Sequence, residues 1–349
     1  MNPAIWALLA TSLLTSTAIT MASNHWLLAW LSLELNTLSI LPIMMNHHHP
    51  RMTEATIKYF LIQATAAASI FFASTLNAWQ TGHWSITHSN SMTTTTLITI
   101  ALALKLGLAP THLWYPEVLQ GLPMYTALVV STWQKLAPLS LLFLLHNNLN
   151  PTLIVLIGLL STLTGGWTGL NQTQTRKLMA FSSIAHMGWL MIALSTSLSL
   201  AALSMMTYLI TATAMFSALA LTATKTMRDT GTTWTTSPTL TTTMMLTLLS
   251  LGGLPPLTGF MPKLLIIKEL TASNLLLLST LLLASTLPSL FFYTRMAYLT
   301  ILTTPPTTTS MKLKWRLNTH HGTTTTTITT TATAAFMLLP LTTVLYNVT

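Results

Sequence analysis

The chain has 349 residues, of which 51% are hydrophobic and only 5% carry a charge. Soluble domains contain about 25% charged residues, so this composition excludes an ordinary soluble protein. Cysteine is absent, which excludes disulfides, thiolate-held iron–sulfur clusters and catalytic thiols. The net charge of +9 would suggest nucleic acid in a soluble protein. Here the basic residues flank apolar stretches, so we expect them to set membrane orientation and expect no nucleic-acid partner.

Apolar stretches long enough to cross a bilayer recur along the whole sequence and predict an all-α, polytopic membrane helix bundle. We predict about eleven transmembrane helices, over residues 3–22, 26–45, 56–79, 95–119, 124–145, 151–170, 178–195, 198–224, 239–267, 274–301 and 326–346. These spans use nearly all of the chain, so we expect a single transmembrane domain over residues 1–349. The first span begins at residue 3, and we expect no targeting segment before it.

The connections between the predicted spans differ in charge. Those after odd-numbered spans carry one basic residue, Lys268, beside Glu269. Those after even-numbered spans carry ten: Arg51, Lys58, Arg176, Lys177, Lys225, Arg228, Arg295, Lys312, Lys314 and Arg316. Positive loops stay on the inner side of a membrane, so the N-terminus is predicted there and the C-terminus on the opposite side. The longest loop, residues 302–323, is basic and is expected to lie on the membrane surface.

Two predicted spans, the fourth and the ninth, are interrupted by glycine and proline. The helix-breaking residues are Gly107 and Pro110 in the fourth span, and Gly252, Gly253, Pro255 and Pro256 in the ninth. Glycine loosens the helical hydrogen-bond ladder, and proline removes a donor and clashes with the preceding turn. Backbone groups freed at membrane depth are tolerated only inside protein or beside a water-filled cavity.

The two broken spans are five spans apart, so they are expected to run in opposite directions. This spacing predicts two inverted five-helix repeats, residues 1–146 and residues 150–301. Residues 302–349 would then hold the basic loop and the last helix. Secondary transporters built in this way have their sites near the bilayer midplane, at interrupted helices.

Apart from charged residues close to span ends, four charged residues lie inside predicted spans: Glu34, Lys105, Lys135 and Lys263. A charge at the bilayer centre costs roughly 2.5–3.5 kcal/mol, and such residues commonly mark ion or proton paths. Lys105 lies about ten residues into its span, or ~15 Å deep at 1.5 Å per residue, which is too deep for simple snorkelling. We interpret the four as proton-translocating groups and expect Glu34 to pair with a lysine.

Two histidines within spans, His112 and His186, are candidate proton relays, because imidazole titrates near neutral pH. The alternative for each is a buried histidine with a structural role only. Glu117 and Glu269 lie at span ends and are interpreted as structural. The consecutive histidines at residues 47–49 cannot easily face one metal ion, so we predict no metal site.

The motifs around these residues resemble a known family over the whole chain. They are Ser32–Asn36 around the mid-span glutamate, Lys105–Pro116, Trp133–Lys135, Arg176–Trp189 and Gly252–Lys263. Any one of them indicates only an antiporter-like subunit. Together they are similar to the antiporter-like, proton-pumping subunit 2 family of NADH:ubiquinone oxidoreductase, respiratory complex I, in its animal mitochondrially encoded form.

The resemblance implies a membrane-arm subunit that moves protons from the matrix to the intermembrane space. Electron transfer from NADH to ubiquinone would take place in other subunits. NADH, FMN, iron–sulfur clusters and ubiquinone would therefore serve the whole complex, with no cofactor or redox centre on this chain. At the positions that match the family's motifs, Glu34, Lys105, Lys135 and Lys263 would belong to the proton-translocation machinery.

The resemblance also implies a location and partners. The chain would be a multi-pass protein of the mitochondrial inner membrane, with its N-terminus on the matrix side and its C-terminus on the intermembrane-space side. Its neighbours would be a small three-helix subunit, the next antiporter-like subunit and accessory subunits. Bound phospholipids such as cardiolipin are expected.

Two other functions are compatible with the same residues. A stand-alone cation/proton antiporter is one, but Na⁺ and K⁺ prefer oxygen ligands, and three of the four central charges are lysines. A non-transporting scaffold subunit is the other, and it predicts that neutralising the lysines leaves coupled activity intact.

Overall fold

A computed structural model describes residues 3–46, 49–88, 91–235, 238–255, 257–302 and 329–335. These residues are largely α-helical and contain no β-strand; two isolated antiparallel bridges join His25 to Ser85 and Gln174 to Thr226. The chain divides into two compact units, Met1–Ser161 and Thr162–Thr349. Within the described residues, eight helical spans are long and apolar enough to cross a membrane, as an all-α membrane bundle requires.

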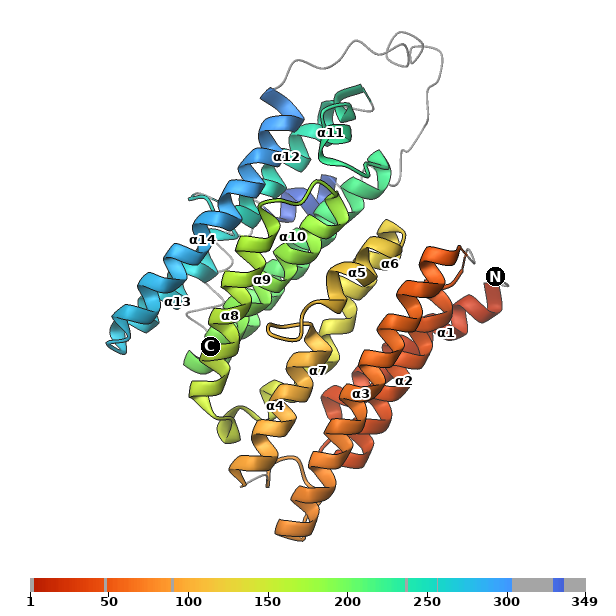
Figure 1. Ribbon diagram of the computed structural model, residues 1–349, viewed down its shortest axis with the longest axis vertical. Helices are drawn as coiled ribbons and strands as arrows, with labels where there is room; N and C mark the ends of the chain where they lie inside the picture. Colours follow the sequence, from red (N-terminus) through yellow and green to blue (C-terminus); the bar gives the residue numbers. More distant parts are fainter. Residues whose placement is uncertain are drawn as a thin grey trace. The chain divides into compact units, whose positions relative to one another are not determined.

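The first unit is a bundle whose helices follow the predicted spans closely. Its elements are α1 (Pro3–Ala22), α2 (Trp26–Met44), α3 (Pro50–Thr81), α4 (Met92–Leu106), α5 (Trp114–Gly121), α6 (Met124–Ser131), the 3₁₀ turn η1 (Trp133–Lys135), α7 (Leu136–Leu144), the 3₁₀ turn η2 (His146–Asn148) and the first part of α8 (Pro151–Gly169). Helix α2 packs between α1 and α3, and α3 also contacts α4 and α5 (Figure 1). Helix α7 contacts α1 and α4.

The polarity of this unit is that of a protein in lipid. Large apolar side chains such as Leu8, Leu14 and Phe72 are exposed, whereas Ser16 and Thr20 are fully buried. The buried hydroxyls donate to the carbonyl one turn back, as Thr20 Oγ1 does to Thr17 O at 2.7 Å. This bond satisfies the hydroxyl without a partner helix, so threonine costs little inside a membrane helix.

The second unit contains the remaining helices. They are the rest of α8, α9 (Thr175–Thr196), α10 (Leu198–Thr222), α11 (Met227–Thr230), the 3₁₀ turn η3 (Thr233–Thr235), α12 (Pro238–Gly252), α13 (Phe260–Ala272), α14 (Leu276–Ala297) and the π-helical turn η4 (Tyr298–Leu302). Helix α9 is central, with 89% of its apolar stretch buried. Helix α10 packs on α9, α12 and α13, and α14 packs on α12.

A short connection at one end of this unit is fixed by a capping box. Thr226 is the N-cap residue of α11, and the Asp229 carboxylate accepts hydrogen bonds from the backbone N–H groups of Thr226 at 2.8 Å and Lys225 at 3.2 Å. The N–H group of Thr226, first among these donors, holds the pKa of Asp229 below its ordinary value because it stabilises the ionised carboxylate. The cap keeps the link between α10 and α12 compact.

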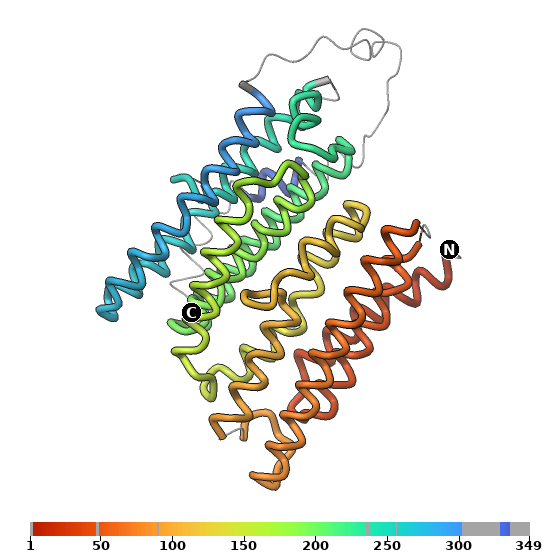
Figure 2. The backbone as a smooth tube through the Cα atoms, viewed as in Figure 1, coloured from red at the N-terminus to blue at the C-terminus, as the bar shows by residue number. Residues whose placement is uncertain are grey.

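The two predicted helix breaks are confirmed. Helix α4 ends at Leu106, and Gly107 then adopts a left-handed conformation with φ of 71°. Helix α12 ends at Gly252, and Gly253 is left-handed with φ of 79°. Pro110 lies in the link between α4 and α5, and Figure 2 traces that part of the backbone.

Pro255 lies in the link between α12 and α13, and the neighbouring Pro256 lies outside the described residues. Each interrupted span becomes two helices, because a left-handed residue cannot continue a right-handed helix.

A third interruption was not predicted. The span expected over residues 124–145 is divided into α6, η1 and α7, with the 3₁₀ turn at Trp133–Lys135. Pro138 explains it: proline has no N–H for the carbonyl of Gln134, and its ring clashes with that carbonyl. Mid-span 3₁₀ turns often mark functional positions, and this one carries Lys135.

Two predictions reach beyond what the structure describes. The basic loop and the eleventh helix are described only at residues 329–335, which are helical. The two units meet within α8, whereas the predicted repeats meet between residues 146 and 150. The inverted relation of the repeats remains a prediction.

Substituting alanine for Gly107 tests whether the break needs glycine. A left-handed alanine costs about 1–2 kcal/mol, and its Cβ would lie 3.2 Å from the Tyr115 Cβ atom, adding an overpacking cost of about 1–3 kcal/mol. Gly82 also has a positive φ, but a Cβ there meets nothing within 4 Å. We therefore expect the thermal unfolding midpoint in detergent to fall further for Gly107→Ala than for Gly82→Ala; equal midpoints would contradict this account.

Candidate functional site

A buried cavity in the first unit, here called the first cavity, brings two of the predicted lysines together. It leaves about 10 Å³ for the centre of a water molecule, which corresponds to roughly one bound water. Its polar lining comes from four helices and the 3₁₀ turn: Asn36, Thr37, Tyr59, Gln63, Lys105, Trp114, Tyr115, Gln134 and Lys135. Lys105 and Lys135 therefore share one small polar space within the membrane bundle.

Lys105 reaches the first cavity from the last turn of α4. Its side chain is 6% exposed, and its Nζ atom has no hydrogen-bond partner among the described residues. The helix break leaves its backbone carbonyl without a helical donor, and Gln63 Nε2 supplies one at 3.2 Å. The break thus presents a buried amine to the cavity while its backbone stays satisfied.

Lys135 reaches the same cavity from η1. Its side chain is 3% exposed, and its Nζ atom lies 5.0 Å from the centroid of the Tyr115 ring. This is within the range of a cation–π interaction. The turn that Pro138 imposes, and not a regular helix, directs Lys135 toward α5.

A reciprocal pair of amide side chains links α2 to this turn. Asn36 Nδ2 donates to Gln134 Oε1 at 3.0 Å, and Gln134 Nε2 donates to Asn36 Oδ1 at 3.3 Å. The Tyr59 hydroxyl lies 3.5 Å from Gln134 Oε1. Both amides are buried, so the pair holds η1 in place by polar contacts that are costly to break.

Glu34 is not among the residues that line the first cavity, and the described part of the chain shows no ion pair between it and Lys105. Leu33 and Thr37 line the cavity from α2, and Glu34, about 100° further round the helix than Leu33, is half-buried. The Thr37 hydroxyl lies 3.2 Å from its Oε2 atom. Its charge still acts favourably on Lys105. The expected pairing of Glu34 with a lysine therefore stays a prediction.

The second unit holds Lys263 and His186 beside two adjoining cavities that both residues line. The cavities leave about 20 and 10 Å³ for water centres, room for a few waters at most. Lys263 Nζ, on α13, donates to the carbonyl of Gly252 at 3.1 Å. A Cβ on Gly253 would lie 2.9 Å from that Nζ atom, so the lysine packs closely against the left-handed glycine of the break.

His186, on α9, contacts two tyrosines in this unit. Its Nε2 atom lies 3.4 Å from the Tyr293 hydroxyl, and its ring centroid lies 5.7 Å from that of Tyr208. The lining of the two cavities also includes several hydroxyl side chains: Ser204, Thr207, Thr211, Ser250, Ser285 and Ser289. A protonatable ring and a lysine thus share a lining able to hold a short hydrogen-bonded chain.

His112 is placed differently from the other predicted residues. It lies in the link between α4 and α5 and is 7% exposed, but it does not line the first cavity. Its Nδ1 atom has no hydrogen-bond partner among the residues described.

The sequence reasoning missed Asn36, Gln134, Tyr115 and Tyr293. Gln134 could have been found from the sequence, because it is a polar residue directly beside the mid-span charge of Lys135. No comparable sequence pattern marks the two tyrosines.

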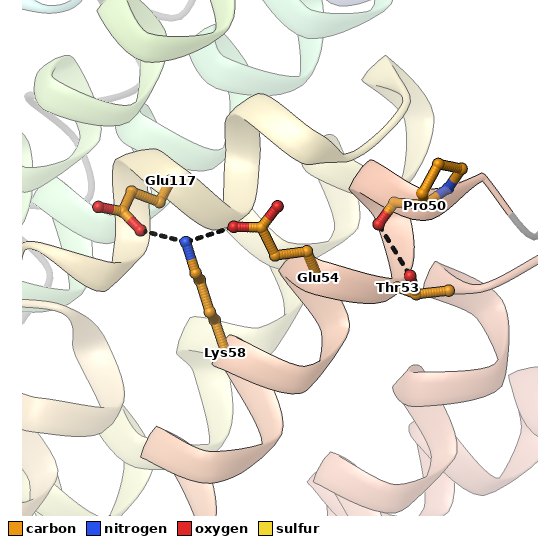
Figure 3. A network of polar contacts seen from close by, with 5 residues as sticks. All are labelled: Pro50, Thr53, Glu54, Lys58 and Glu117. Atoms are coloured by element: carbon orange, nitrogen blue, oxygen red, sulfur yellow. Dashed lines mark hydrogen bonds and ion pairs between the residues drawn. The ribbon is translucent and has the colours of Figure 1, made fainter.

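A charged cluster at the end of α3 accounts for Glu117. Lys58 Nζ lies 2.8 Å from Glu54 Oε1 and 2.8 Å from Glu117 Oε2 (Figure 3). The three side chains are 41–65% exposed, so water screens both ion pairs and each adds little to stability. Glu117 therefore anchors α5 to α3 at the surface, as its structural interpretation predicts.

Comparison with known proteins gives consistent matches. The transmembrane model of the NADH:quinone oxidoreductase/Mrp antiporter family matches residues 23–288, and a model of the NADH dehydrogenase subunit 2 C-terminus matches residues 290–346. NADH-ubiquinone oxidoreductase chain 2 of Formosania lacustris is 50% identical across 98% of both chains. The chain of that name from Carassius auratus is 56% identical over 61% of this chain, and this alignment spans 62% of the Carassius protein.

Two solved structures share the fold. A chain of respiratory complex I from Thermus thermophilus aligns with a TM-score of 0.82 and 24% identity, covering 96% of this chain and 79% of that one. A chain of the archaeal membrane-bound sulfane sulfur reductase aligns with a TM-score of 0.85 and 18% identity, covering 98% and 74%.

The free energy of coupling between Asn36 and Gln134 can be measured. Asn36→Leu or Gln134→Met leaves the other amide buried without its partner, which costs about 1–3 kcal/mol. The double variant removes both amides, so its loss should be smaller than the sum of the single losses. Thermal unfolding of the four proteins measures this coupling, and additive losses would show that the two amides act independently.

Proposed function

The chain belongs to the NADH:quinone oxidoreductase/Mrp antiporter transmembrane family, and we propose that it is a proton-translocating membrane subunit of mitochondrial NADH:ubiquinone oxidoreductase. One observation carries this function: buried lysines stand beside interrupted helices and line small polar cavities. Lysine in a membrane interior is costly, and each of these cavities gives the amine a route for exchanging a proton with water. The family match and the vertebrate relatives support the choice of complex.

Protons would pass through each unit by exchange between neighbouring groups. Lys105 and Lys135 line one cavity, and like charges in a small space repel. A proton arriving on one lysine therefore favours release from the other. In the second unit, Lys263 and His186 would exchange protons through the water and hydroxyl groups around them. Glu34 would favour the charged form of Lys105, and His112 would serve as an accessory relay at the helix break.

The whole complex would supply the electron chemistry. We propose that NADH, FMN, iron–sulfur clusters and ubiquinone act in other subunits, and that this chain carries no redox centre. It would lie in the mitochondrial inner membrane with its N-terminus toward the matrix. A small three-helix subunit, a second antiporter-like subunit, accessory subunits and phospholipids would be its neighbours.

Two rival functions are separable by experiment. A stand-alone cation/proton antiporter would purify without flavin and iron–sulfur subunits, whereas the proposed subunit would co-purify with them. A scaffold subunit would keep full coupled activity after its lysines are neutralised. The buried amines favour the proposed proton transfer over both rival functions. Burying a lysine costs free energy, and a scaffold subunit would gain nothing from that cost.

Lys105→Ala tests the proton path directly. We expect proton pumping and coupled quinone reduction to fall about tenfold, equivalent to about 1.4 kcal/mol in barrier, because the cavity loses one of its two lysines. NADH oxidation by an artificial acceptor at the flavin should stay near normal. Lys58→Ala, which removes an exposed lysine, is the matched control and should leave pumping unchanged. Equal loss of pumping and flavin-site activity in Lys105→Ala would indicate failed assembly.

The long-range interaction of Glu34 with Lys105 makes a second prediction. Glu34→Gln keeps the side chain's shape but removes the charge that favours the Lys105 ammonium, so the variant should assemble and pump poorly, with an altered pH dependence. The double variant with Lys105→Met should lose less pumping activity than the sum of the losses in the two single variants, because neither charge is then left without its counterpart. Pumping rates of the three variants across pH test this, and strictly additive losses would separate the two residues.

A further inference from the structure

The contact between Lys135 and Tyr115 is specific to one charge state of the lysine. The Lys135 Nζ atom lies 5.0 Å from the centroid of the Tyr115 ring, and Tyr115 is 2% exposed. The negative face of an aromatic ring attracts an ammonium ion, and the attraction is stronger where water is excluded. A neutral amine has no net charge for the ring to attract. The ring face therefore distinguishes the protonated lysine from the deprotonated one.

The broken helix is what delivers this ring. Tyr115 lies in the first turn of α5, and a Cβ on Gly107 would approach its Cβ and Cγ atoms to 3.2 and 3.3 Å. These contacts are tighter than an ordinary van der Waals contact, so a side chain at residue 107 would push against the ring. The Trp114 ring meets the Tyr115 ring edge to face, with centroids 5.5 Å apart. Gly107 and Trp114 thus fix the ring on the side of the first cavity that Lys135 faces.

We propose, on the basis of the proposed function, that Tyr115 is a positioning residue. It would hold the protonated Lys135 side chain against its ring and release that side chain when the lysine loses its proton. The ammonium of Lys135 gives its proton to water or a neighbouring base in the first cavity and becomes a neutral amine. The attraction to the ring ends at that moment. The flexible side chain then moves within the cavity until it is protonated again.

Among the described residues, three other charged or titratable side chains lie around the first cavity. Lys105 faces it from α4 and Tyr59 from α3, and Glu34 is linked to it through Thr37 on α2. Lys105 repels the Lys135 ammonium when both are charged, so the ring opposes that repulsion. The ring thereby widens the pH range in which Lys135 starts the cycle protonated.

The test compares ring-keeping and ring-removing variants in the assembled complex. Tyr115→Phe keeps the aromatic face, so proton pumping should stay within about twofold of the unmodified complex. Tyr115→Leu removes the face, so pumping should fall at least tenfold at neutral pH, and the alkaline limb of the pH–rate profile should move to lower pH. NADH oxidation at the flavin reports that the complex has assembled. Tyr115→Met, whose flexible side chain fills the space without a ring, stands in if the leucine variant fails to assemble.

Two outcomes would overturn the inference. One is equal pumping and an equal pH profile for the phenylalanine and leucine or methionine variants. The other is an equal loss in all of them, which would assign the role to the hydroxyl. Lys135→Met separates this from the proposed function: retained pumping in that variant defeats the proposed function itself. In the Lys135→Met background, removing the Tyr115 ring should have no further effect, and a further tenfold loss there would mean that the ring does not act through Lys135.

Discussion

Every backbone carbonyl and amide inside a bilayer needs a hydrogen-bond partner within the protein, and this constraint governs where the helices of this chain can break. The two units meet it in different ways. In the first unit, the carbonyl of Lys105 has no helical donor because α4 ends there, and the neutral amide of Gln63 donates a hydrogen bond to it. In the second, the carbonyl of Gly252 at the end of α12 accepts from Lys263 itself. The lysine of the second unit is therefore also part of the helix cap, whereas that of the first is left facing the cavity.

This difference separates the chemistry of the two units. Lys263 is tied to the backbone by its bond to the Gly252 carbonyl, and under the proposed function it would exchange protons through His186 and Tyr293, which line the same cavity. In the first unit, Lys105 Nζ has no hydrogen-bond partner among the described residues, and Lys105 shares one cavity with Lys135. The first cavity accordingly surrounds its two amines with amides and aromatic rings, which act on the charge without forming an ion pair.

Much of this arrangement follows from sequence. The span positions and both predicted breaks depend on hydropathy, glycine and proline, which act locally, and the buried lysines stood out because charge is so rare in the chain. The turn at Lys135 was also encoded, by Pro138, but one proline in a long apolar run does not reveal whether the helix bends or changes type. The Asn36–Gln134 pair joins residues 98 positions apart, and the face of Tyr115 reaches Lys135 only after the α4–α5 link has folded back. Contacts of that kind depend on tertiary packing, which no local pattern reports.

The hydroxyls that bond back within their own helix also bear on how such a sequence can diverge. In α4, Thr96 Oγ1 donates to Thr93 O at 2.9 Å and Thr99 Oγ1 donates to Thr96 O at 2.8 Å. A threonine bonded in this way offers its neighbours mainly a methyl group, so it can exchange with an aliphatic residue at many helix positions with little effect on packing. Such exchanges can accumulate over evolutionary time, and the hydropathy of a helix can drift while its backbone stays the same. Gly107 and Lys135 lie outside this freedom, because Gly107 has a left-handed backbone and the charge of Lys135 is central to the proposed function.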